Sequence, residues 1–198
     1  PPFHQLPMAK AISKKIDHID LAYPVAAKIC SSDICHKTEI GGVQLNIASK
    51  SELTTTIASI ITSVKHHAPD ARLDGILIES MINNVILELM ASLRRDPQFG
   101  LVLTIASGGV MTEILQDAST VLVPADDISL LAALDSLRIA PLFDGFRGGQ
   151  AASRTAVLDQ IKGLVSLMKD APDIKEIEIN PIMVGKDYAC CADAVSYT

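Results

Sequence analysis

The chain has 198 residues, 48% of them hydrophobic, with a formal net charge of −6 and a pI near 5.3. A chain of this length and apolar content can bury a core, and its acidic balance argues against binding to a polyanion such as DNA. No apolar run approaches the ~20 residues that cross a bilayer, so we expect a folded, soluble protein with no membrane or nucleic-acid partner.

The start of the chain, residues 1–4, lacks the charged and apolar segments of a secretory signal. It also lacks an initiator methionine, which indicates a fragment of a longer polypeptide or a processed subunit. The cysteines, Cys30, Cys35, Cys190 and Cys191, show no paired C-x-x-C spacing of a structural zinc site. We therefore expect reduced thiols and a cytoplasmic location.

Predicted strands and helices are interleaved along the chain. The predicted strands are 25–30, 43–47, 75–80, 86–93, 101–105, 174–179 and 188–195. Three helices are predicted from the apolar stripes Leu53, Ile57, Ile60 and Val64; Ile128, Leu131, Leu134 and Leu137; and Val157, Ile161, Leu164 and Met168. Because few residues join 75–80 to 86–93, these two strands should be antiparallel neighbours. The pattern favours the α+β class, and no interdomain linker is visible.

The segment 175–181 has one apolar and one polar face. Alternation places Ile177 and Ile179 on one face and Glu176, Glu178 and Asn180 on the other. Pro181 is expected to end the regular ladder, and the last strand to return alongside and bring Asp193 near the polar face. Two carboxylates and an amide oxygen suit Mg²⁺ together with substrate phosphates. A half-buried strand with one solvated face explains the same alternation.

A second group of polar residues lies near the start of the chain. Lys28 interrupts an apolar strand, so its ammonium must reach solvent, pair with an acid or meet a ligand phosphate. Gly41 and Gly42 precede the next strand, where glycines leave backbone N–H groups free for phosphate oxygens or simply form a turn. His36, just before them, could act as acid, base or nucleophile, or be a solvated loop residue.

Taken in order, these segments resemble the ATP-grasp domain of ADP-forming acyl-CoA synthetases. The matching segments are 23–29, 33–43, 74–81, 88–90, 95–100, 108–109 with Glu113, and 178–181. Each is weak alone, but their ordered series is specific and runs from about residue 20 to the end. The resemblance implies one ATP-grasp domain over residues 1–198, an α+β fold in which two lobes enclose a nucleotide, with the N-terminal part incomplete.

The resemblance also implies ATP or ADP as ligand and assigns nucleotide contacts. Lys28 would contact the phosphates, with Gly41 and Gly42 in the loop above them. The residues assigned to the adenine and the ribose are Glu79, Met81 and Glu88.

Metal binding and phosphoryl transfer are assigned in the same way. By resemblance, Glu178, Asn180 and Asp193 would be the Mg²⁺ ligands. His36 would relay phosphate between the nucleotide and a phosphohistidine on another domain.

The implied reaction interconverts acyl-CoA, phosphate and ADP with an acid, CoA and ATP. The CoA-binding and ligase domains, fused or in a separate subunit, would bind the acyl substrate and CoA, and oligomers are compatible with this arrangement. Two rivals stay open. Departures from the family pattern at Ser92, Ala106 and 150–153 favour a degenerate ATP-grasp regulatory module in a multidomain fusion. A different ATP-grasp carboxylate ligase would form an acyl phosphate and need no histidine relay.

Overall fold

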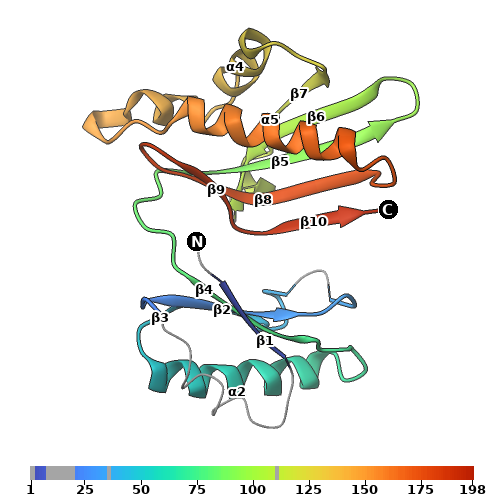
Figure 1. Ribbon diagram of the computed structural model, residues 1–198. Helices are drawn as coiled ribbons and strands as arrows, with labels where there is room; N and C mark the ends of the chain where they lie inside the picture. The colour runs from blue at the N-terminus through green and yellow to red at the C-terminus, as the bar shows by residue number, and fades with distance from the viewer. Residues whose placement is uncertain (1–2, 8–20, 35–36, 110–111) are drawn as a thin grey trace. The chain divides into compact units, whose positions relative to one another are not determined.

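The computed structural model describes residues 3–7, 21–34, 37–109 and 112–198 of the chain (Figure 1). The chain divides into two compact units, Pro1–Asn83 and Asn84–Thr198. Each unit has its own sheet, its own helical cover and its own cluster of buried apolar side chains. The predicted α+β class is confirmed. Among the described residues, no helix is long and apolar enough to cross a membrane.

In its described residues, the first unit is a four-stranded antiparallel sheet with one long helix. Its elements are β1 (Phe3–Pro7), β2 (Val25–Cys30), β3 (Val43–Ile47), α2 (Lys50–His67) and β4 (Gly75–Ser80), with strand order β1-β4-β2-β3. Helix α2 begins after Ser49, whose side chain accepts from the N–H of Glu52, and it buries the predicted stripe. Because the apolar side chains of β2 face this helix, Lys28 lies on the other face of the sheet.

The second unit is a six-stranded antiparallel sheet. Its elements are β5 (Leu87–Asp96), β6 (Gly100–Ser107), α3 (Thr112–Leu115), β7 (Ala118–Val123), α4 (Asp127–Asp135), η2 (Ala140–Asp144), η3 (Phe146–Gly148), α5 (Arg154–Asp170), β8 (Glu176–Val184), β9 (Ala189–Cys191) and β10 (Ala194–Tyr197). The strand order is β10-β8-β5-β6-β7, with β9 also paired to β8. Helices α4 and α5 lie over one face of this sheet (Figure 1). The other face carries the polar side chains of β5 and β8.

Strands β4 and β5 do not pair, so the prediction that these two strands are antiparallel neighbours is wrong. β4 belongs to the first sheet and β5 to the second, and the boundary between the units falls at Asn83 and Asn84. A short connection permits a hairpin, but it equally allows the chain to leave one sheet and start another. Residues 81–86, which join the two strands, contain no glycine or proline, so no residue type there marks a linker.

Helix α4 forms where it is predicted and buries part of the predicted stripe: Leu134 and, beyond the helix end, Leu137 are buried, and Leu131 packs partly buried against the core. Leu130, Ala133 and Leu134 are buried, whereas Ile128 is 77% exposed. The helix has only nine residues and is apolar on several sides, so its spacing alone does not select one stripe. In helix α5, by contrast, the whole predicted stripe is buried.

Candidate functional site

Strand β8 continues through Pro181 to Val184, so the expectation that Pro181 ends the ladder is wrong. The pairing register places two residues of β8, Asn180 and Pro181, opposite one residue of β5, Met90. Pro181, which has no N–H to donate, therefore lies at the bulge, where the ladder of hydrogen bonds between β5 and β8 is interrupted. The bulge also shifts the buried positions of β8 by one residue, so that Asn180 lies at the point where the alternation changes phase.

The end of the chain returns beside β8, as the sequence predicts. It does so as two strands, β9 and β10, separated by Ala192 and Asp193. In this break the N–H of Ala192 donates to the carbonyl of Pro181 (3.0 Å), and the N–H of Asn180 donates to the carbonyl of Asp193 (3.1 Å). Asp193 is therefore held next to Asn180 through the backbone.

Gly109 is the point at which polar groups from two strands meet. Its N–H donates to Oδ1 of Asn180 (2.9 Å). A Cβ at Gly109 would lie 1.7 Å from Oε2 of Glu88, and its φ is +63°. The N–H of Gly108 donates to the carbonyl of Glu88 (2.8 Å). A Cβ at Gly108 would lie 2.4 Å from the carbonyl oxygen of Leu89, so the side chain of Glu88 and the backbone of Leu89 together require the glycine pair. We call Glu88, Gly109, Asn180 and Asp193 the Gly109 cluster.

Glu178 lies two residues before Asn180 on the same strand. It is opposite Ser92 of β5 and Val195 of β10, and it is partly exposed. The hydroxyl of Ser92 donates to Glu176 instead (2.7 Å). Among the described residues, the Glu178 carboxylate has no hydrogen-bond or ion-pair partner, so its oxygens are available to a ligand.

The oxygen donors near Asn180 fit Mg²⁺ in kind. Oδ1 of Asn180 accepts the Gly109 N–H with one lone pair and keeps the other for a cation. Within the described residues no three His, Cys, Asp or Glu side chains come together as a metal site, so a cation at this point would have at most two carboxylate ligands. That number suits Mg²⁺, which takes one or two carboxylates and completes its shell with waters and phosphates.

Lys28 pairs with an acid on the neighbouring strand. Its Nζ lies 2.8 Å from Oε2 of Glu79, and the two side chains are only 16% and 21% exposed. Cys30, two residues on, shares this face of the sheet; burial raises the pKa of its thiol, and the charge of Lys37 acts in the opposite direction. The face away from α2 therefore carries Lys28, Glu79 and Cys30.

The N–H groups of Gly41 and Gly42 are already hydrogen-bonded within the protein, so the prediction that they are free for phosphate oxygens is wrong. The N–H of Gly41 donates to the carbonyl of Thr38 (3.1 Å) and that of Gly42 to the carbonyl of Lys37 (2.7 Å). The glycines are explained by packing: a Cβ at Gly42 would lie 2.8 Å from the Lys37 carbonyl, and Gly41 has φ +69°.

Met81 and His36 are the remaining predicted site residues. The N–H of Met81 donates to the carbonyl of Pro24 (3.1 Å), so this segment would meet an adenine through other groups. His36 lies outside the described residues, and so does Cys35.

Several departures from the family pattern have structural roles. Ser92 binds Glu176, and Ser153 caps α5 by accepting from the N–H of Ala156. Ser107, next to Ala106, donates to the buried Asp117 (3.0 Å). Sequence reasoning missed Asp117 entirely; an isolated aspartate between two apolar runs was the only signal.

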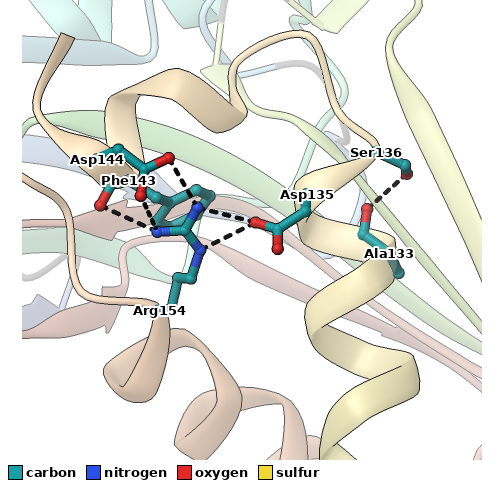
Figure 2. Close-up of polar contacts among 6 residues, drawn as sticks. All are labelled: Ala133, Asp135, Ser136, Phe143, Asp144 and Arg154. Carbon is teal, nitrogen blue, oxygen red and sulfur yellow. Dashed lines mark hydrogen bonds and ion pairs between the residues drawn. The ribbon is translucent and has the colours of Figure 1, made fainter.

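Figure 2 shows a second polar group in this unit, around Arg154 at the start of α5. Its guanidinium binds the carboxylates of Asp135 and Asp144 and the carbonyl of Phe143. The hydrogen bond from Arg154 holds the pKa of Asp144 below its usual value. Arg154 and the two aspartates line an open pocket of about 640 Å³, together with Arg138.

Comparisons with known proteins place these observations in a family context. Residues 8–196 match the sequence profile of an ATP-grasp domain. The chain is 34% identical over 175 residues to the β subunit of acetate–CoA ligase (ADP-forming) I of Pyrococcus furiosus, covering 88% of this chain and 75% of that subunit. It is 31% identical over 164 residues to acetate–CoA ligase (ADP-forming) I of Archaeoglobus fulgidus, covering 83% of this chain but 24% of that protein.

Solved structures agree with the sequence matches. The dinucleotide-forming acetyl-coenzyme A synthetase 1 of Ca. Korarchaeum cryptofilum, in complex with coenzyme A and Ca-AMPCP, superposes with a TM-score of 0.87 at 27% identity. The superposition covers 98% of this chain and 83% of the matched chain. The present chain thus spans most of a separate β subunit and about a quarter of the longer A. fulgidus relative.

Proposed function

Because this chain belongs to the ATP-grasp family, in the group that contains the β subunits of ADP-forming acetate–CoA ligases, we propose that it is the nucleotide-binding portion of an ADP-forming acid–CoA ligase. Such an enzyme interconverts an acid, CoA and ATP with acyl-CoA, ADP and phosphate. The structural observation that carries the proposal is the Gly109 cluster with Glu178 beside it, a set of oxygen donors of the kind that Mg-nucleotides need.

Each unit contributes separate roles in this proposal. In the first unit, Lys28 binds phosphate oxygens, and its ion pair with Glu79 holds the ammonium in place until a phosphate competes for it. In the second unit, the Glu88 carboxylate accepts from ribose hydroxyls. Glu178, Asn180 and Asp193 hold Mg²⁺, which would supply charge neutralisation for the phosphates.

His36 is the proposed nucleophile that relays the phosphoryl group. Its attacking nitrogen must be unprotonated, which an ordinary histidine is near neutral pH. The remaining contribution of the chain is positioning and electrostatic stabilisation, the usual sources of catalysis in phosphoryl transfer. Partner domains, fused or separate, would bind CoA and the acyl substrate.

The first test is calorimetric titration of the chain with ADP and ATP, with and without Mg²⁺. We expect magnesium-dependent binding in the micromolar to submillimolar range. A folded chain that binds neither nucleotide under either condition contradicts the proposal and favours the degenerate regulatory module.

The histidine relay needs a second test, in the enzyme reconstituted with its CoA-binding partner. His36→Ala should abolish acyl-CoA synthesis and leave Mg-nucleotide affinity unchanged, because the histidine transfers phosphate without anchoring the nucleotide. Full activity of His36→Ala would instead fit an ATP-grasp ligase that has no relay.

A further inference from the structure

Two polar side chains are buried beside the Gly109 cluster. Among the described residues, Ser107 (2% exposed) and Asp117 (8% exposed) are the only polar or charged residues that are buried. A buried carboxylate is unfavourable unless it is hydrogen-bonded, so its contacts indicate what keeps it there.

Within the part of the chain that the structure describes, the hydrogen-bond donors to Asp117 are all neutral. Its Oδ2 accepts from the hydroxyl of Ser107 (3.0 Å) and from the backbone N–H of Arg138 (2.8 Å). Its carbonyl accepts from the N–H of Ser107 (3.0 Å). These bonds fix the end of β6 to the start of β7 and to the segment that follows α4.

The end of β6 determines where the next two N–H groups lie. Ser107 is followed by Gly108, whose N–H donates to the Glu88 carbonyl, and by Gly109, whose N–H donates to Oδ1 of Asn180. A backbone donor at this point requires the oxygen of the amide, not its nitrogen, to face Gly109. The side chain of Asn180 is thereby turned into the orientation that a cation ligand needs.

We propose that Asp117 is a positioning residue that orients Asn180 for Mg²⁺ through Ser107 and the Gly108–Gly109 backbone. The inference rests on the proposed magnesium-nucleotide function of the same unit. Groups that orient metal ligands typically contribute 10- to 100-fold to metal affinity. A purely structural Asp117 would affect stability alone.

The variants Asp117→Ala and Asp117→Asn separate these two roles. Alanine removes the acceptor for Ser107 and Arg138, whereas asparagine keeps one side-chain oxygen that accepts both bonds. We expect Asp117→Ala to raise the Kd of Mg-ADP by about 10-fold or more and to leave the Kd of ADP without Mg²⁺ unchanged. Asp117→Asn should restore most of the magnesium dependence.

Arg95→Lys is the matched control for lost stability. Arg95 donates to the carbonyls of Met168, Ala171 and Ile174 at the end of α5, and it touches no member of the Gly109 cluster. This variant should lower Tm and leave the magnesium dependence intact. The proposal is overturned if Asp117→Ala is folded and binds Mg-ADP as tightly as the parent chain.

Ser107→Ala covers the case in which Asp117→Ala does not fold. It removes one hydrogen bond of the buried pair and leaves the Arg138 N–H bonded to the carboxylate. A smaller rise in the Kd of Mg-ADP, again absent without Mg²⁺, supports the proposal. An unchanged Kd for Mg-ADP overturns it.

Hydrogen exchange gives a readout that does not depend on nucleotide. If Asp117 positions Gly109, the Gly109 amide should exchange faster in Ser107→Ala and Asp117→Ala, and the side-chain amide resonances of Asn180 should shift. Unchanged Gly109 exchange overturns the positioning role. A parent chain with no Mg-nucleotide binding would refute the proposed function and leave this exchange test valid.

Discussion

Among single residues, Asn180 is held on the polar face of the second sheet by both its side chain and its backbone. It lies at a bulge, its amide oxygen accepts from Gly109, and its N–H donates to Asp193. Glu178, two residues before it, has no such constraint and is partly exposed. The two residues should therefore respond differently to substitution, since one is held by the protein and the other is available to a ligand.

Glu178→Ala should weaken Mg-nucleotide binding without unfolding the chain. The side chain fills no core space, so its removal leaves no cavity and Tm should stay near the parent value. Calorimetry with Mg-ADP and a thermal melt measure the two effects. Glu176→Ala, on the same face and strand, is the control, because Glu176 accepts from Ser92 and has no assigned metal role. A collapse of Tm in Glu178→Ala would make it a structural residue.

The Asp144 carboxylate should make stability depend on pH. Arg154 lowers its pKa in the folded chain, so the unfolded chain binds more protons in acid. The contribution is thus present above about pH 4 and is lost as pH falls through the lowered pKa. Asp144→Asn should unfold at lower urea concentration than the parent at pH 6, with the difference shrinking towards pH 3. An equal difference at both pH values would show that the ion pair adds nothing.

At the scale of elements, local pattern predicted most of the fold. Strands β2, β3 and β4 have the predicted bounds, because each is a short apolar run between turn residues. Strand β7 was not predicted, since its residues 118–123 begin with small polar side chains that also suit a loop. Which strands pair has a weaker local signal: the short connection between β4 and β5 suggested a hairpin, but β5 pairs with β6 and β8.

In the candidate site, too, the features with a local sequence pattern were predicted and those that depend on loop closure were not. Alternation correctly put Ile177 and Ile179 in the core and Glu178 on the opposite face, because the period of a strand is local. The bonds of Gly41 to Thr38 and of Asp117 to Ser107 depend on how loops close, and sequence spacing does not encode that closure. The assigned roles of Lys28, Glu88 and Asp193 stay predictions.

The C-terminus of α5 depends on one side chain from β5. Arg95 donates to the carbonyl of Met168 in the last turn, which has an unsatisfied acceptor at a helix end, and to the carbonyls of Ala171 and Ile174 just beyond the helix. Arg95→Lys keeps the charge but loses the planar fork, so the free energy of unfolding should fall by about 1–3 kcal/mol. Urea unfolding measures this change. A loss below about 0.5 kcal/mol would show that solvent replaces the guanidinium at these carbonyls.

At the scale of the whole molecule, the two units have separate cores. The cluster in Asn84–Thr198 includes side chains from its sheet and from α4 and α5, and the cluster in the first unit includes α2 and its own sheet. Residues 84–198 expressed alone should therefore fold. A cooperative thermal transition and a dispersed NMR spectrum would confirm it, and a spectrum typical of a disordered chain would contradict it. The matched fragment 1–83 tests the other unit in the same way.

The division at Asn83 and Asn84 also has a genetic consequence. Each unit is one uninterrupted stretch of sequence, so a single recombination event at this point exchanges one complete unit for its counterpart in a related gene. Such an exchange separates the segment that carries Lys28 from the segment that carries Asn180 and disrupts neither sheet. We expect chimaeras joined here to accumulate as soluble protein more often than chimaeras joined inside β5, where the exchange would place two unmatched halves of one strand in the same sheet.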